Sequence, residues 1–538
     1  MIKRFTWGKP IETEAVIRRE AVVLMEGLLQ VPFFSKVCPG DGKASVLTYD
    51  MGEHDRIYGL GENIRGINKR GWLYVSDCVD DPIHTEARHN LYASHNFFLI
   101  DGRERFGVFV DAPQKVAFDL GYTDRDRITV TVDEGGFDLY ILEGDNVRQM
   151  VREFRQVIGR SYIPPKWGFG YGQSRWGYKN EEDIRQVVQK HRDAGVPLDS
   201  VYMDIDYMER FKDFTVDEGK FPNFPRFVEE MKAQNIHLVP IIDAGVKIEE
   251  GYPVYDEGVE RGYFCKKEDG KEFVGGVWPG RVHFPDMLND DARRWFGRKY
   301  KFLLDQGIDG FWNDMNEPAL FYGEDNLDEV FRKLEDYGNQ ELNIKSFFGM
   351  KNLVLGIANR KEDYESFYHQ YRGRRIRHDR VHNLYGYYMT RAAGEAFDRL
   401  RPDQRILMFS RASYIGMHRY GGVWTGDNCS WWSHLLMNLQ MLPGLNMCGF
   451  LFTGADLGGF GADATEDLLL RWLELGIFTP LMRNHSAKRT RRQEFSQFGH
   501  AEDFRNVIGL RYGLLPYIYS EFMKAAMTGD MMFMPVAF

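Results

Sequence analysis

Cysteine is scarce in this chain, and long apolar runs are missing. The five cysteines are scattered over 538 residues without a Cys-x-x-Cys pair, so the sequence supports neither a zinc ribbon nor a disulfide framework. No run of about 18 apolar residues exists, so no membrane span is predicted. The start, from Met1 to Trp7, lacks both a long apolar run and a small-residue cleavage site, so it does not resemble a secretory signal. We therefore expect a protein of the reducing cytoplasm.

An excess of basic residues is also absent. Asp and Glu number 79 against 69 Lys and Arg, and the net charge of −10 argues against nucleic acid as a partner. Apolar and aromatic residues are plentiful: 43% are hydrophobic and 14% aromatic, enough for a large core and suited to a sugar-binding protein. The length allows roughly two to four domains. The oligomeric state does not follow from composition.

One stretch joins an apolar strand to polar side chains at its end. A glycine turn leads into the run FWNDMNEP at residues 311–318. Acids, an amide and an indole make a poor core and a good active-site rim, and parallel barrels keep catalysis at the carboxyl ends of their strands. Asp314 is therefore a candidate catalytic carboxylate, although Asp is also common in capped loops.

A second stretch has the same arrangement. Residues 421–428, GGVWTGDN, form a short strand followed by Asp427. Two carboxylates supply the nucleophile and the acid/base of glycoside cleavage, and tryptophan faces stack on sugar rings. Because Asp314 and Asp427 lie far apart in the sequence, they need a fold that brings distant strand ends together, as a closed parallel barrel does.

Together the two stretches resemble glycoside hydrolase family 31, the α-glucosidase and α-xylosidase family. The first matches its W-x-D-M-N-E signature and the second its W-x-G-D-N motif. The resemblance runs from about Tyr58 to the end of the chain. It implies that Asp314 is the nucleophile and Asp427 the acid/base.

The chain divides near residue 163. Before it, β-rich runs bounded by turn residues predict an antiparallel β-sandwich over residues 1–162. After it, strands alternate with helices, which predicts an α/β fold, a (β/α)₈ TIM barrel over residues 163–538. We expect the barrel strands at 168–173, 200–204, 238–243, 310–314, 406–410, 423–426, 449–453 and 479–483. Helices are expected between most of these strands, such as residues 181–194.

Two interruptions of the barrel are longer than ordinary loops. Residues 247–283 follow the third strand and residues 322–380 the fourth, and we expect them to fold over the barrel mouth. The resemblance also implies β-domains after the barrel. These are absent from this sequence, so we expect either a fragment or a chain without them.

The resemblance implies further contacts with the sugar. Asp204, at the end of the second strand, is expected to bind hydroxyls, and Ile205 follows the α-glucosidase pattern rather than the Cys-Phe of α-xylosidases. Arg411 and His485 end the fifth and eighth strands and are expected to bind hydroxyls too. Without the resemblance, Arg411 suggests a structural ion pair and His485 a satisfied core residue.

Aromatic walls are expected around the sugar. Trp278, Trp312, Trp424 and Phe460 are assigned to the glycone pocket and Trp176 to the leaving-group side, although each alone is more often a core residue. From the sandwich, a loop is expected to reach the barrel mouth. It is expected to place Asp80 on the substrate, with Asp81 as the alternative.

The expected chemistry is a retaining hydrolysis that needs no metal or cofactor. Asp314 attacks the anomeric carbon and Asp427 protonates the leaving oxygen, so the substrate is a short oligosaccharide that loses terminal α-linked glucose. An α-xylosidase or a transglucosidase with the same site is the alternative. A metal-dependent glycosyltransferase that uses Asp204 and Asp206 is a weaker one. The sequence does not give the linkage.

Overall fold

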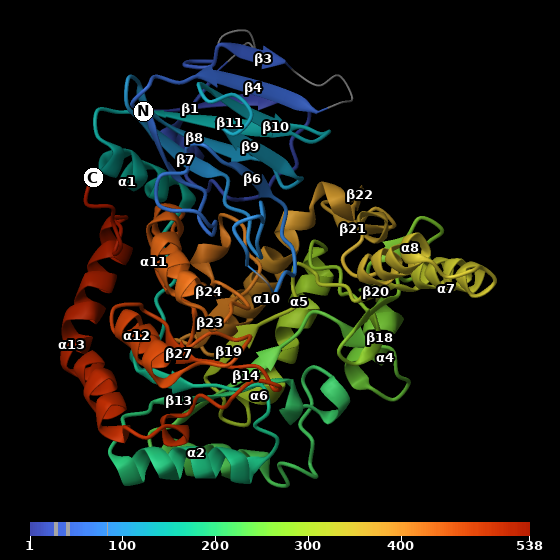
Figure 1. Cartoon of the computed structure of the whole chain (residues 1–538), viewed down its shortest axis with the longest axis vertical. Helices are drawn as coiled ribbons and strands as arrows, with labels where there is room; N and C mark the ends of the chain where they lie inside the picture. The colour runs from blue at the N-terminus through green and yellow to red at the C-terminus, as the bar shows by residue number, and fades with distance from the viewer. Residues whose placement is uncertain (26–30, 39–43, 83) are drawn as a thin grey trace.

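The N-terminal part of the chain is a sandwich of two β-sheets. The computed structural model describes residues 1–25, 31–38, 44–82 and 84–538 (Figure 1). One sheet has the order β2-β1-β11-β8-β7-β5 and the other β3-β4-β10-β9-β6, and every neighbouring pair is antiparallel except β1 and β2. The strands are β1 (Ile2–Trp7), β2 (Val22–Leu24), β3 (Lys36–Cys38), β4 (Ser45–Asp50), β5 (Arg56–Gly59), β6 (Leu73–Ser76), β7 (Phe97–Asp101), β8 (Arg105–Asp111), β9 (Val116–Leu120), β10 (Arg127–Val132) and β11 (Phe137–Glu143). The predicted antiparallel sandwich is confirmed.

The burial of these strands follows their position. β4 and β10 alternate buried and partly exposed residues, because only one face of their sheet meets the core between the sheets. β7 and β8 are nearly continuous buried runs. Their second face is covered by helix α1 (Val147–Ile158), where Phe154 stacks on Phe97 with ring centroids 3.9 Å apart. This helix leads the chain from the sandwich into the second part.

The second part is a parallel barrel, so the predicted TIM barrel is confirmed. Its strand order is β25-β24-β23-β19-β14-β13-β12-β27-β26. Only Ala455 separates β25 from β26, so residues 453–457 connect both edges and complete the ring. The strands are β12 (Tyr171–Gln173), β13 (Ser200–Met203), β14 (His237–Ile242), β19 (Gly310–Asn313), β23 (Leu407–Ser410), β24 (Gly422–Trp424), β25 (Thr453–Gly454), β26 (Asp456–Leu457) and β27 (Met482–Asn484).

Three barrel strands start three or four residues later than predicted. The first begins at Tyr171 because residues Lys166–Phe169 form a 3₁₀ turn. The seventh begins at Thr453 because Gly449, at φ 93°, closes the end of the preceding helix. The eighth begins at Met482 because Thr479 forms a turn, with its hydroxyl donating to backbone carbonyls. In each case an apolar run before the strand is a buried turn.

Helices surround the barrel (Figure 1). Helix α2 matches its predicted bounds because Asn180 caps its start, accepting a hydrogen bond from the Asp183 amide, and Gly195 in the left-handed region ends it. The others are α3 (Phe224–Ala233), α5 (Asp290–Lys299), α6 (Lys301–Leu304), α10 (Tyr385–Leu400), α11 (Trp432–Met447), α12 (Glu466–Gly476) and α13 (Ala501–Thr528), with α2 itself at Glu181–Ala194. Among the described residues, none of the helices combines the length and the apolarity that a membrane span needs.

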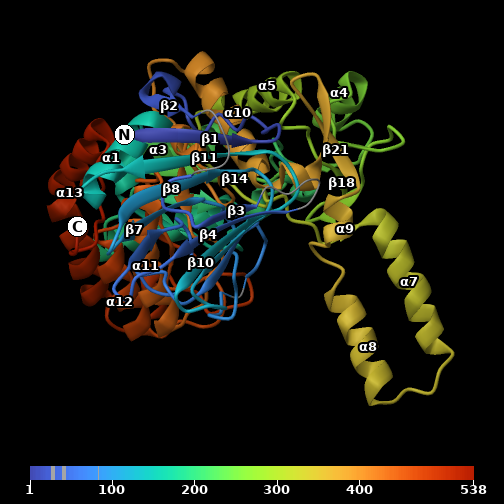
Figure 2. The ribbon, with the colours of Figure 1, turned by 90° about the horizontal axis from the view of Figure 1, so that it is seen from above.

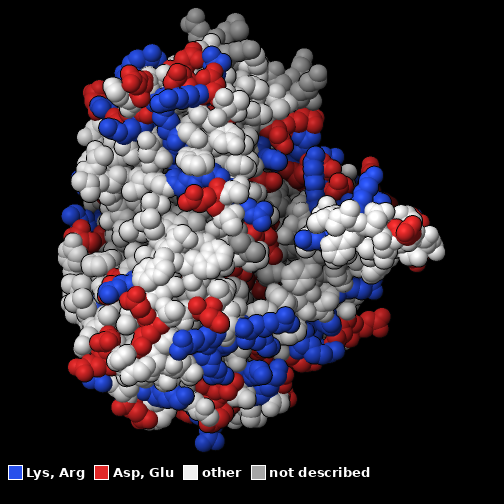
Figure 3. Space-filling model, in the orientation of Figure 1, with Lys and Arg blue, Asp and Glu red and all other residues white. Residues whose placement is uncertain are grey.

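The two insertions share a sheet of order β15-β18-β17-β20, formed by β15 (Val246–Lys247), β17 (Gly275–Val277), β18 (Gly280–His283) and β20 (Tyr322–Gly323). A second sheet joins β16 (Lys266–Lys267), β21 (Phe367–Tyr371) and β22 (Arg374–Arg377). The remaining helices are α4 (Pro253–Arg261), α7 (Glu324–Gly338), α8 (Ile344–Leu355) and α9 (Lys361–Tyr364). Helices α7 and α8 form a hairpin that projects away from the body (Figure 2) and is largely uncharged on the face in Figure 3.

Candidate active site

A cavity of about 270 Å³ opens at the carboxyl ends of the barrel strands. Most of the residues predicted to bind substrate line it together. They are Asp80, Trp176, Asp204, Ile205, Trp278, Asp314, Arg411, Asp427, Phe460 and His485. Four lining residues were not predicted from the sequence: Pro82, Ile241, Met315 and Phe321.

Arg411, directly after β23, is the centre of the site. Its side chain is only 2% exposed. Its Nε and Nη2 donate to the two carboxylate oxygens of Glu317, each at 2.8 Å, which is the bidentate geometry of a strong ion pair. Its Nη1 lies 2.9 Å from Oδ1 of Asp314. One buried guanidinium therefore holds the end of β19 in place.

The same guanidinium reaches two further carboxylates. Nη1 of Arg411 is 3.9 Å from Oδ2 of Asp427, and Nη2 is 3.4 Å from Oδ1 of Asp80. The ring of Tyr92 lies 4.6 Å from the guanidinium carbon, in a cation–π contact. The two predicted catalytic carboxylates, Asp314 and Asp427, therefore both approach the same guanidinium nitrogen, Nη1.

These two carboxyl groups differ in acidity. Burial raises the pKa of Asp427 well above its ordinary value; Arg411, at 3.9 Å, opposes the rise, and the charge of Asp314 adds to it. Burial also raises the pKa of Asp314, but Arg411 at 2.9 Å and the Met315 amide, which donates to Asp314 at 2.7 Å, oppose the rise. Asp314 is therefore the group that ionises first, and Asp427 the one that keeps its proton.

Asp204 and His485 form a second polar pair in the cavity. Nε2 of His485 lies 3.5 Å from Oδ2 of Asp204, and its Nδ1 lies 2.7 Å from Oγ of Ser174. Burial lowers the pKa of His485 well below its ordinary value, so the ring is neutral. Burial raises the pKa of Asp204 to about 8, and the charge of Asp314 contributes. The pair is suited to sugar hydroxyls, which both donate and accept hydrogen bonds.

Two predicted wall residues lie deeper than the cavity lining. Trp312 and Trp424 are each 1% exposed and flank Arg483, whose guanidinium carbon is 4.7 Å and 5.4 Å from their rings. The Trp312 ring meets His485 edge-on at 5.5 Å, and Phe460 stacks on His485 at 5.0 Å. The two tryptophans therefore support the site from below, and a direct contact with sugar stays a prediction.

The outer walls come from outside the barrel. Trp278, in the turn between β17 and β18, packs edge-on against Trp176 at 5.1 Å and Phe321 at 4.9 Å. From the sandwich, Asp80 lines the cavity, whereas its neighbour Asp81 pairs with Arg88 at 2.6 Å. The sandwich and the insertions thus both contribute residues to the cavity.

Sequence reasoning missed two acids at the centre of the site. Glu317 stands inside the first motif, but only the structure places it against Arg411, where burial raises its pKa to about 7. Asp243 ends β14 as Asp314 ends β19, and burial, together with Asp213 and Asp314, raises its pKa well above its ordinary value. Its place at a strand end was the signal that could have identified it.

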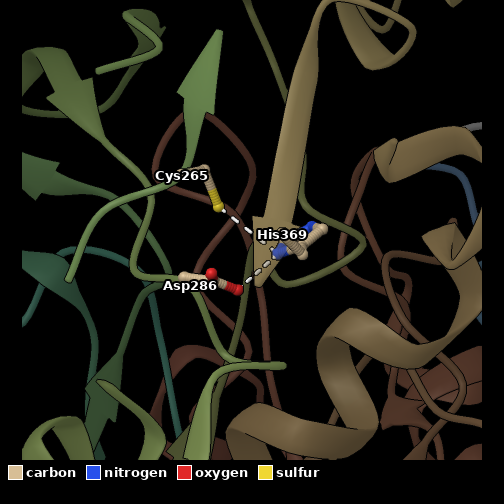
Figure 4. A group of neighbouring side chains, drawn as sticks. All are labelled: Cys265, Asp286 and His369. Atoms are coloured by element: carbon tan, nitrogen blue, oxygen red, sulfur yellow. Dashed lines mark hydrogen bonds and ion pairs between the residues drawn. The ribbon is translucent and has the colours of Figure 1, made fainter. Parts of the chain in front are cut away.

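Possible metal ligands lie elsewhere. Within the described parts of the chain, Cys265, Asp286 and His369 bring ligand atoms within 4.8 Å of one another, and these residues do not line the cavity (Figure 4). In the Asp204-x-Asp206 pattern, Asp206 pairs with Nζ of Lys488 at 3.1 Å. That ion pair occupies the carboxylate a glycosyltransferase would need for its metal.

Comparison with known proteins identifies both parts of the fold. Residues 161–521 match the family model of the TIM-barrel domain of glycosyl hydrolases family 31. Residues 11–119 match the model of the glycosyl hydrolase 31 N-terminal galactose mutarotase-like domain.

Individual relatives extend over nearly the whole chain. Alpha-glucosidase 2 of Bacillus thermoamyloliquefaciens is 35% identical over 91% of this chain and 58% of that protein. The alpha-glucosidase of Saccharolobus solfataricus is 32% identical over 90% of this chain and 68% of that protein. The solved structure of a Flavobacterium johnsoniae dextranase complexed with isomaltotriose has a TM-score of 0.78 at 23% identity, over 93% of this chain and 58% of that one. The chain thus spans between 58% and 68% of the two curated relatives, and the dextranase likeness concerns the fold alone.

Proposed function

The chain belongs to glycosyl hydrolase family 31, and on that premise we propose that it is a retaining, exo-acting α-glucosidase. The observation that supports the proposal is that Asp314 and Asp427 line one cavity and both approach Nη1 of Arg411. Two relatives above 30% identity carry the name alpha-glucosidase, which supports glucose as the sugar.

In the first step, Asp314 acts as the nucleophile. Its carboxylate attacks the anomeric carbon as Asp427 passes its proton to the leaving oxygen, so the glycosidic bond breaks and a β-glucosyl ester forms. Arg411 favours this division of roles because its charge lies closer to Asp314 than to Asp427.

In the second step, Asp427 acts as the base and Asp314 is the leaving group. Asp427, now ionised, takes a proton from a water molecule, whose oxygen attacks the anomeric carbon and releases Asp314. Two inversions retain the α configuration. Asp204 and His485 are placed to hold hydroxyl groups of the ring during both steps.

The size of the cavity supports an exo action on a short substrate. At about 270 Å³ it is smaller than the roughly 300–1,000 Å³ pockets that hold drug-sized ligands, which suits one terminal sugar ring. Trp176 and Trp278 at its rim are placed to contact the leaving sugar. For the location we propose the cytoplasm, because the five cysteines are all free thiols.

The test is hydrolysis of p-nitrophenyl α-D-glucoside and maltose by the parent, Asp314→Asn and Asp427→Asn. We expect both variants to lose about 10²–10⁴-fold in activity, with the loss for Asp427→Asn smaller on the nitrophenyl substrate, whose leaving group needs less protonation. Asp403→Asn makes the same change at an exposed position and serves as the control. NMR of the first product should find α-glucose.

Three outcomes contradict parts of the proposal. β-Glucose as the first product excludes retention. Activity only on an α-xyloside contradicts glucose as the sugar but leaves the proposed roles of Asp314 and Asp427 intact. Activity that survives both substitutions removes Asp314 and Asp427 from the mechanism altogether.

A further inference from the structure

Helices α7 and α8, here called the helical hairpin (residues 324–355), have almost no core of their own. Val330 is the one buried residue of α7, and Ser346 is the one buried residue of α8. Helices of 15 and 12 residues are marginally stable in water without packing. The helical hairpin projects away from the body (Figure 2), so the body does not supply that packing. Its apolar residues therefore need a further surface on which to be buried.

Helix α8 carries an apolar stripe on its solvent side. The five residues of the stripe are between 48% and 72% exposed: Ile344, Phe347, Phe348, Val354 and Leu355. Their spacings of three, four and seven residues place them on one face of the helix. Another face meets α7, where a Cβ on Gly349 would collide with the Tyr337 hydroxyl. A soluble helix normally turns such a stripe towards a core, so the stripe has the character of a contact surface.

The exposed apolar area of the helical hairpin approaches that of a protein interface. Phe331 of α7 and Leu342 of the connection are 54% and 62% exposed and add to the stripe. At roughly 100 Å² for each half-exposed side chain, these seven residues present about 700 Å². A stable complex buries about 800 Å² on each partner, and the largest apolar patch of a typical monomer is about 300–600 Å². The area is therefore sufficient for one specific partner.

The two helices of the helical hairpin carry opposite charges. Helix α7 has six acidic and two basic residues, whereas α8 has two lysines and no acid. Lys351 stands within the apolar stripe of α8. On α7, Asp328 and Glu335 flank Phe331 at the spacing of one helix face. All three charged side chains are exposed, and within the described parts of the chain none of them forms an ion pair.

We propose that the helical hairpin binds the helical hairpin of a second copy of this chain, with α8 of each copy against α7 of the other. A two-fold axis makes each contact occur twice, so a surface that joins a basic apolar helix to an acidic one is complementary to itself. In this pairing, Lys351 of one copy meets Asp328 and Glu335 of the other. Phe331 packs against the apolar stripe, and the two hairpins form a four-helix bundle.

The base of the helical hairpin is fixed to the body at both ends. Before the first turn of α7 is complete, Glu324 pairs with Arg281 at 2.7 Å. After α8, the side-chain oxygen of Asn359 accepts the Leu320 amide at 2.8 Å. A surface that is held in place loses less conformational freedom when it binds than one on a free tether. The two contacts therefore favour association of the hairpins.

A membrane surface is the rival partner for an exposed apolar stripe. Anionic lipid headgroups attract clusters of lysine and arginine. Residues 324–355 hold seven acidic side chains against four basic ones, so such headgroups repel the helical hairpin as a whole. The uncharged part of its surface in Figure 3 is therefore better matched to a second copy, which supplies both charges.

The test is the molar mass of the full chain in solution, measured by light scattering and by sedimentation equilibrium over a range of concentrations. We expect a dimer whose dissociation constant rises at least about thirtyfold in Phe347→Glu, the effect of one interface hot spot. Phe302→Glu makes the same change at a phenylalanine of α6 that is 45% exposed, and it should leave the dissociation constant unchanged. A parent that stays monomeric at the highest concentration overturns the proposal, as does a dimer that Phe347→Glu leaves intact.

Charge exchange tests which helices meet. Lys351→Glu should dissociate the dimer, and so should the double variant Asp328→Lys/Glu335→Lys, because like charges then meet across the two-fold axis. A mixture of these two variants should form a heterodimer, since the reversed charges match again. Thermal unfolding checks that each variant is folded. If the double variant dimerises as tightly as the parent, the pairing of α8 with α7 is wrong.

A vesicle assay distinguishes the rival partner. Vesicles of phosphatidylcholine and phosphatidylserine should not sediment with the parent. A monomeric parent that binds them and loses binding in Phe347→Glu replaces the second copy by a membrane. None of these measurements depends on glucosidase activity, so the dimer and the proposed function are tested separately.

Discussion

Replacing Arg411 by methionine removes the charge on which four carboxylates converge. The substitution keeps an unbranched apolar side chain and deletes the two 2.8 Å bonds to Glu317. Glu317 is fully buried, so it keeps its desolvation cost without its partner. Asp314 loses its contact at 2.9 Å in the same step. We therefore expect a loss of both stability and activity.

The loss of stability follows from the burial of the pair. Removing one partner of a buried ion pair costs about 3–5 kcal/mol. An unfolding entropy of about 2.1 cal/mol/K per residue gives roughly 1.1 kcal/mol/K for this chain, so the unfolding midpoint should fall by about 3–5 °C. Burial already raises the pKa of Glu317 to about 7. Without Arg411 that pKa rises further, so the deficit is largest at alkaline pH and shrinks as the pH falls and Glu317 takes up a proton.

A double substitution distinguishes this reasoning from general damage. Thermal unfolding is compared for Arg411→Met, Glu317→Gln, the double variant and Arg405→Met, which makes the same change at an exposed arginine. The double variant should recover more than half of the lost midpoint, because the fully buried Glu317 no longer carries an unpaired charge. It should stay inactive, because Asp314 still lacks its guanidinium. A midpoint for Arg411→Met equal to that of the parent, or no recovery in the double variant, would refute the argument.

Three other outcomes are expected. The kcat/KM of the parent should fall as the pH rises through the raised pKa of Asp427, because the acid must be protonated, and a pH–rate profile without this alkaline limb contradicts the assignment. Asp530→Asn should lower the unfolding midpoint at neutral pH. Burial raises the pKa of Asp530, but Arg148 and Arg152 of α1 outweigh burial and hold this pKa below its ordinary value. The stabilisation by ionised Asp530 is therefore present above the pKa of the unfolded protein and is lost in acid. The unfolding midpoints of parent and variant should therefore converge as the pH falls, and a difference in midpoint that does not change with pH contradicts this prediction. Trp176→Ala should raise the KM for maltose and leave the glucose inhibition constant unchanged, whereas a change in both places Trp176 in the glycone pocket.

The barrel could be predicted because its strands and helices follow the order of a parallel α/β fold. The short apolar runs caused the errors. Residues 449–452 and 479–481 are as apolar as strands, but they pass through buried turns before the sheet begins. Periodicity alone does not separate a short buried strand from a buried turn. The bounds of α2 could be predicted because a cap and a terminal glycine mark both ends.

The residues of the candidate site also divide into those that the sequence could predict and those that it could not. Asp314 and Asp427 could be identified because each stands at the end of a strand inside a recognisable motif. Trp312 and Trp424 share those motifs yet lie beneath the cavity, because each precedes its carboxylate by two or three residues and so lies deeper in the barrel, where tryptophan also fills cores. The partner of Arg411 could not be found this way, since an ion pair between two strand ends depends on tertiary structure.

Three parts of the chain line the cavity, and on the proposed function this affects the choice of substrate. The barrel supplies the two carboxyl groups of Asp314 and Asp427, but its strand ends alone would leave the cavity open at the sides. One side is closed by Asp80 from the sandwich and another by Trp278 of the first insertion and Phe321, directly before the second. On the proposed function, we expect these loops to set the length of the substrate. A change in the loops should then alter the preferred oligosaccharide, while Arg411 and the carboxylates around it stay fixed.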